Sequence, residues 1–146
     1  MKNWIIPVLA AIGIIGLLFF VFQGKKAHSQ ATSIVLTWTA SGDDGVVGTA
    51  TSYKMRYSTT RPDTASVSAM DSWWATATVV SGLPLPKIAG SAETFTVVGT
   101  FITGQTYYFL MQACDEVPNC SPYSNLAQKF IPDTLPPSKI ANLFAQ

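Results

Sequence analysis

The chain has 146 residues, a length that predicts one domain with additional segments. Its formal net charge is +1, and no basic patch or stripe appears, so nucleic acid is not an expected partner. After residue 30 the chain is rich in Ser and Thr and poor in charge. That composition favours a surface-exposed β domain and does not indicate disorder.

Residues 5–22 form an uncharged apolar run of eighteen residues. The run is near the lower limit for crossing a bilayer and long for the core of a signal peptide, so it predicts one N-terminal hydrophobic helix. We interpret residues 1–29 as either a cleaved signal peptide or a membrane anchor with a short spacer. In both cases we expect the rest of the chain to be extracytoplasmic, either secreted or anchored in the membrane through residues 5–22 if these stay uncleaved.

A hydrophobic period of two dominates the chain after residue 30 and predicts strands. The predicted strands are 33–39, 53–57, 94–98, 106–114 and about 124–130. In the first of them Ile34, Leu36 and Trp38 share one face, and in the second Lys54 and Arg56 are expected to face solvent. Short strands at this spacing predict an antiparallel all-β sandwich, in which we expect no helix.

Two cysteines, Cys114 and Cys120, flank a turn that contains Pro118 and Asn119. In an exported chain this pair is expected to form a disulfide that closes a hairpin. A metal site built on the pair would need more Cys or His ligands than the chain has.

Four stretches carry a family resemblance in their order along the chain: 36–58, 89–99, 106–116 and 119–127. They resemble a fibronectin type III domain, particularly the variety found in exported bacterial proteins. The resemblance implies an immunoglobulin-like sandwich over residues 30–131. It also implies that Tyr107 forms a tyrosine corner, with its hydroxyl bonded back to the turn near Gly104. The turn before Tyr107 is one residue longer than the common pattern, and Cys120 stands where a tryptophan is frequent.

Catalysis is not expected from this sequence. The only histidine, His28, lies beside the apolar run and outside the domain, so a Ser or Cys nucleophile has no base. Asp43 and Asp44 are adjacent and point apart in an extended loop, which does not suit an acid and base pair. We therefore predict a protein that is not an enzyme.

Acidic residues suggest a calcium site as one interpretation. In the predicted fold, the loop with Asp43 and Asp44 lies at the same pole as the loop with Asp115 and Glu116, and four carboxylates can supply oxygen ligands. The alternative is that these residues are solvated turn formers, since Asp-Gly is itself a turn dipeptide.

Aromatic residues suggest a second kind of binding site. On a strand, one of the neighbours Trp73 and Trp74 would face outward, where together with Tyr108 it could stack on a sugar ring or anchor a protein partner. The alternative is that both tryptophans lie over the edge of the sandwich as a covering flap.

The C-terminal residues 132–146 form a proline-led linker and a tail that resembles the first strand, strand A, of a fibronectin type III domain. Ile140, Leu143 and Phe144 are the apolar residues of this tail. Upstream of the first predicted strand, by contrast, no apolar alternation indicates a strand A. The chain therefore has a surplus last strand and lacks an evident first one.

Three interpretations of the surplus tail and the missing first strand stay open. The tail is a remnant of a tandem array, or residues 27–33 form a poor strand A, or the tail is a donor strand for an open edge. In the third case Ile34, Leu36 and Trp38 line the acceptor, and donation to the next molecule gives a head-to-tail homopolymer.

These observations predict a non-catalytic exported surface module for adhesion or structural assembly, with a protein or a surface polysaccharide as its partner. The alternative function is a carbohydrate-binding accessory module that uses Trp73, Trp74 and Tyr108.

Overall fold

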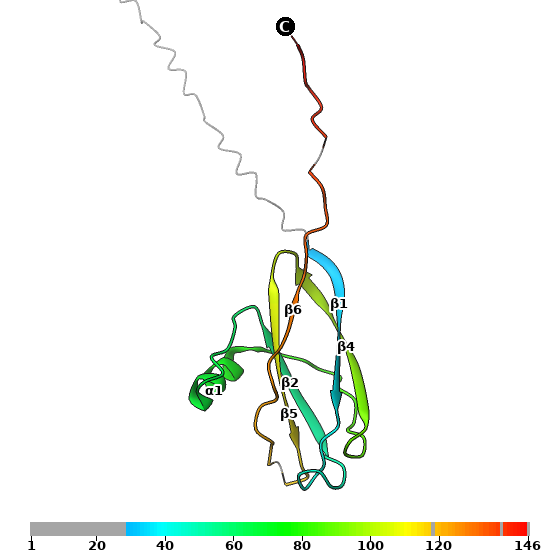
Figure 1. Ribbon diagram of the computed structural model, residues 1–146, viewed down its shortest axis with the longest axis vertical. Helices are drawn as coiled ribbons and strands as arrows, with labels where there is room; N and C mark the ends of the chain where they lie inside the picture. The colour runs from blue at the N-terminus through cyan, green and yellow to red at the C-terminus, as the bar shows by residue number, and fades with distance from the viewer. Residues whose placement is uncertain (1–28, 118, 138, 146) are drawn as a thin grey trace, which may run out of the picture.

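A computed structural model describes residues 29–117, 119–137 and 139–145 (Figure 1). Its elements are β1 (Ser29–Thr39), β2 (Ser52–Ser58), α1 (Val67–Thr76), β3 (Thr78–Val79), β4 (Ala92–Ile102), β5 (Thr106–Cys114) and β6 (Ala127–Phe130). The predicted N-terminal helix lies outside the described residues. Within the described ranges, no helix is long and apolar enough to cross a membrane.

The strands form two antiparallel sheets, which confirms the prediction of an all-β sandwich. One sheet has the order β1-β4 and the other has the order β3-β2-β5-β6. The core lies between them because side chains alternate along each strand. Ile34 and Phe101 from the first sheet pack in one cluster with Met55 and Phe109 from the second.

Strand β1 begins at Ser29, earlier than the predicted start near Ser33. Residues 29–33 pair with Ile102 to Val98 of β4 as one continuous strand. The interpretation that residues 27–33 form a separate strand A is therefore wrong for residues 29–33, and residues 27–28 lie outside the described part. Strand β4 is longer than its apolar pattern suggested. Its backbone supplies hydrogen-bond partners for residues 29–33 of β1, and backbone pairing does not depend on alternating apolar side chains.

Helix α1 is the element that the strand pattern missed. The Ser66 side chain caps it by accepting a hydrogen bond from the Ala69 N–H. The helix covers the outer face of the four-stranded sheet, where Leu110 of β5 is only 1% exposed. Arg56 points to the outer face of β2, as predicted, but it is only partly exposed, because its guanidinium lies under the helix and donates to the Trp74 carbonyl at 2.5 Å.

The corner between β4 and β5 fixes the end of the domain from which the tail departs. The Tyr107 hydroxyl accepts a hydrogen bond of 2.7 Å from the Ile102 N–H, two residues before Gly104. Ile131 is buried here, its N–H donates to the Gln105 carbonyl, and its carbonyl accepts from the Gly104 N–H. The chain after Ile131 leaves at the end of the sandwich where β1 begins (Figure 1).

Candidate functional site: an open sheet edge and its groove

The free edge of β1 is the candidate site. Strand β1 pairs with β4 on one side, and in the described part of the chain no strand pairs with its other side. Since alternate residues of a strand point their N–H and C=O groups to opposite sides, a row of unpaired backbone groups remains along this edge. Such an edge can accept one additional strand.

The outer side of β4 differs from the outer side of β1. The connection 80–88 runs beside β4, where Leu83 packs against the core and the Lys87 N–H donates to Glu93 of β4 at 2.8 Å. This connection covers the β4 side of the sandwich. Among the residues described, no equivalent segment covers the β1 side.

A groove lies beside the β1 edge, between β1 and residues 121–127. Its inner part, of about 90 Å³, is bounded by Leu36 of β1 and by Met55, Phe109 and Met111 from the facing sheet. Ligand pockets usually occupy about 300–1,000 Å³, so this part is sized for a side chain and not for a whole small molecule. An outer part of about 400 Å³ continues along β1 toward Ser41.

The predicted acceptor residues line this incompletely covered side. Ile34 is 3% exposed and belongs to the core, whereas Leu36 and Trp38 pack against the core but remain only partly buried. Leu36 and Trp38 are partly exposed because the groove leaves this side of the core in contact with solvent. The alternation in the sequence therefore predicted correctly which face of β1 packs on the core. How completely that face is covered is known only from the structure.

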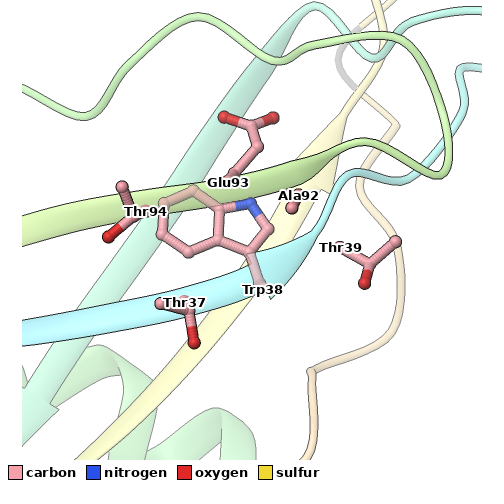
Figure 2. Close-up of a pocket in the computed structure, with 6 residues that line it drawn as sticks. All are labelled: Thr37, Trp38, Thr39, Ala92, Glu93 and Thr94. Carbon is pink, nitrogen blue, oxygen red and sulfur yellow. The ribbon is translucent and has the colours of Figure 1, made fainter.

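Trp38 lies at the end of β1 across from β4, beside Glu93 and Thr94 (Figure 2). Its ring makes an edge-to-face contact with Tyr53, with ring centroids 5.4 Å apart. The indole Nε1 is buried and makes no hydrogen bond of good geometry, although its N–H is close enough to the Tyr53 hydroxyl to lower the pKa of that group. A buried donor without an acceptor is unfavourable, so this end of the strand is incompletely satisfied.

Glu93 is a buried residue that the sequence analysis missed. It is 4% exposed, and its Oε1 accepts hydrogen bonds of 2.8 Å from the Tyr53 hydroxyl and from the Lys87 N–H. Burial chiefly raises the pKa of Tyr53, and Glu93 raises it further, while the nearby Trp38 N–H opposes the shift. The signal was available, because Glu93 has the same parity as the inward-facing Phe95 and Val97, although the strand was predicted to start at residue 94.

The four acidic residues lie at one end of the sandwich, as predicted. Burial, followed by the charges of Glu116, Asp44 and Asp115, raises the pKa of Asp43. The Asp115 carboxylate, however, caps its own turn by accepting from the Asn119 N–H at 2.8 Å and from the Asn119 side chain. Over the described ranges, no group of three or more His, Cys, Asp or Glu residues is arranged to hold a metal ion.

Trp73 and Trp74 lie on helix α1, so the strand geometry from which one of them was expected to face outward does not apply. Trp73 is 7% exposed, and its indole N–H donates to the Thr60 carbonyl at 2.6 Å. It packs on Leu110 with Tyr108 beside it. The position of Trp73 agrees with a covering flap, because its ring closes the outer face of the sheet.

Trp74 is half-buried in the same cluster. The Arg56 guanidinium lies over its ring at 5.3 Å from the centroid, and the Tyr123 ring packs against it at 5.1 Å. The Trp74 ring therefore already has partners in the domain. A ligand could contact only the exposed part of this ring and the exposed part of Tyr108.

Cys114 and Cys120 form the predicted disulfide at the end of β5. The two residues also make an antiparallel bridge, so the disulfide closes the hairpin between β5 and the segment that leads to β6. This segment, residues 121–127, forms the outer wall of the groove.

The predicted donor residues do not contact the acceptor within one chain. Ile140, Leu143 and Phe144 are 81%, 85% and 85% exposed. The segment that carries them extends away from the sandwich (Figure 1). Over the described ranges, neither the donor segment nor the acceptor edge is covered by another part of the chain.

Comparison with known proteins finds a similarity that covers most of this chain. The chain is 36% identical over 118 residues to calcium-activated chloride channel regulator 1 of Macaca mulatta and of Homo sapiens. The match covers 77% of this chain and spans 12% of the length of each relative. No family model matches the chain, and no solved structure matches it.

Proposed function

We propose that this chain is an exported, non-catalytic module of the fibronectin type III kind that serves adhesion or structural assembly by accepting a strand at the β1 edge. The observation that supports this function is that β1, among the residues described, pairs on one side only and lies beside an apolar groove. Strand addition of this kind combines main-chain hydrogen bonds along a free edge with pockets for alternate side chains.

The strand neighbours support the fibronectin type III assignment. In immunoglobulin-like sandwiches strand B lies between A and E, and strands C, F and G are neighbours in the other sheet. Here β1-β4 corresponds to B-E, and β2-β5-β6 corresponds to C-F-G. The free edge of β1 is therefore the position of strand A. The hydrogen bond of Tyr107 to Ile102 is the contact expected of a tyrosine corner.

The relatives support a modular role and nothing more specific. Their name describes a regulator of a calcium-activated chloride channel, and the shared stretch is a small part of that protein. A stretch of this size suits one module among others. We assign no channel activity and no calcium requirement to this chain.

Carbohydrate binding is the weaker proposal. It was based on three aromatic residues, of which Trp73 is buried with its N–H bonded. Trp74 and Tyr108 keep partial exposure, so a surface polysaccharide would have to bind over α1 and not at the β1 edge.

A photo-crosslinking side chain placed at Thr37 in the full chain tests the proposed function in the producing cells. Thr37 is exposed on β1, and Thr96 is an exposed residue of β4 that serves as a matched control. We expect covalent protein adducts at position 37 and few at position 96. Absence of adducts, or equal adducts at both positions, would contradict strand addition at β1.

A further inference from the structure

We propose that the strand accepted at the β1 edge is residues 139–145 of a second copy of this chain, inserted antiparallel to β1. This inference rests on the proposed function, and it names the partner. Each copy then supplies a tail to one neighbour and a groove to another, so the contact is head-to-tail and can repeat.

The direction of the tail favours a neighbour over the tail's own domain. The tail departs where β1 begins, and an antiparallel donor must start where β1 ends. Strand β1 has eleven residues, a length of about 36 Å. The link from Ile131 to Lys139 spans at most about 29 Å even when fully extended, and it contains Pro136 and Pro137. The tail therefore cannot return to its own β1 in this orientation, whereas it extends away from its own domain, where it can meet a second copy.

The register follows from the two faces of the donor strand. Over residues 140–145 one face carries Ala141, Leu143 and Ala145 and is wholly apolar, and Lys139, of the same parity, lies beyond the groove at the start of the donor strand. The other face carries Asn142 between Ile140 and Phe144, and turning it inward would bury an amide in the apolar groove. The apolar face therefore points inward.

Leu143 is then best placed opposite Leu36, where its side chain fills the inner pocket of about 90 Å³. Because directly opposed residues share a face, the same register places the small Ala141 opposite Trp38. The large indole and the small methyl group fill the space between the strands in a complementary way.

Charge complementarity supports the same register. Lys139 comes to lie at the end of β1, the end at which Asp43, Asp44, Asp115 and Glu116 gather. These like charges repel one another, and an incoming ammonium group reduces the repulsion. The opposite orientation of the donor would place Lys139 at the other end, away from the acids.

The outer face gains a contact as well. In this register Phe144 lies opposite Val35, which is 61% exposed in the single chain. Aromatic and β-branched residues across neighbouring strands stabilise each other, so donation covers an apolar side chain that the single chain leaves in water.

Mixed disulfide formation between two differently tagged full chains tests the inference. One chain carries Thr37→Cys and the other carries Asn142→Cys, two exposed positions that this register places opposite each other. Under mild oxidation we expect a reducible species that contains both tags. A second substitution, Leu143→Asp, in the donor chain should reduce this species at least tenfold. A pair of Thr96→Cys and Asn142→Cys chains is the matched control.

Two results overturn the inference. One is a mixed species no more abundant than with the Thr96→Cys control. The other is a link that forms only when both cysteines are in one chain, which would mean that the tail serves its own domain. If the photo-crosslinker at Thr37 captures a different protein while no mixed disulfide forms, the β1 edge is still a strand acceptor and only the identity of the donor is wrong. If neither experiment gives a link, the proposed function fails too.

Discussion

Replacing Trp73 by alanine tests whether helix α1 is a structural cover or a ligand platform. Trp73 is 7% exposed and shields Leu110, which is 1% exposed. Truncating a buried tryptophan to alanine costs about 3–5 kcal/mol, and the lost hydrogen bond to the Thr60 carbonyl accounts for about 1 kcal/mol of that loss. Since a domain of this kind is stable by about 5–15 kcal/mol, the variant should retain its fold with a large loss of stability.

Pulse proteolysis of the full chain across a urea series measures this loss. Trp74→Ala is the matched control, because Trp74 is only half-buried at the side of this cluster and its ring makes one aromatic pair and one cation–π contact. Those contacts are worth about 1–2 kcal/mol together. A loss below about 1 kcal/mol for Trp73→Ala, or a loss equal to that of Trp74→Ala, would refute the assignment of Trp73 as the main residue of the cover.

This prediction also decides how carbohydrate binding must be tested. A glycan signal lost in Trp73→Ala would be explained by the loss of stability, because the side chain is buried. Trp74→Ala is the informative variant, since it removes a partly exposed ring and should leave most of the stability. Glycan binding that survives Trp74→Ala would argue against stacking on α1.

Three further predictions concern stability. Tyr53→Phe leaves the buried Glu93 carboxylate with one backbone donor and should cost about 1.5–3 kcal/mol in the same urea series; an unchanged midpoint would contradict the buried hydrogen bond. The pKa of Asp43 is raised above its ordinary 3.8, so protonated Asp43 favours the folded state; this contribution to stability is fully present below pH 3.8 and is lost as the pH rises through the raised pKa. Asp43→Asn should therefore increase the Tm at pH 7 and flatten the pH dependence of the Tm. An unchanged Tm at pH 7 would contradict this prediction. Replacing both Cys114 and Cys120 by serine should cost about 2 kcal/mol, because the closed loop is short, and a loss above about 4 kcal/mol would show that more than loop closure is involved.

Strand alternation predicted the interior well and the element ends poorly. Tyr53 and Met55 of β2 and Tyr107 and Phe109 of β5 lie on the core side, as the period of two indicated. The additional residues of β1 and β4 are held by pairing between the strands. Such pairing depends on backbone hydrogen bonds and leaves little trace in side-chain polarity.

Helix α1 could have been predicted from a signal in the sequence. Met70, Trp73, Trp74 and Ala77 follow the spacing i, i+3, i+4 and i+7, and Ser66 is a suitable N-cap. No element was predicted there, because the prediction followed the period of two that dominates the rest of the chain. The tertiary reason for the helix is an outward-facing leucine on β5 that requires a cover, and that requirement is not visible locally.

The buried acid Glu93 shows what a single sequence cannot supply. Its hydrogen-bond donor Tyr53 lies forty positions away, and the two meet only because β2 and β4 belong to facing sheets. The groove beside β1 is of the same kind. Its walls come from β1 and residues 121–127, and its floor comes from β2 and β5. Sequence reasoning identified the residues of one wall, but the space between the walls is a property of the assembled sandwich.

The length and composition of β1 favour coverage of its edge by another strand. Proteins usually protect a free edge with charged residues, proline, bulges or very short strands. The free edge strand β3 has two residues, and β6 carries Lys129. Strand β1 has eleven residues with no charge and no proline. In the described part of the chain this edge has no cover, and an exposed edge of this length can pair with unrelated strands; the partner strand proposed above would keep such a module from aggregating.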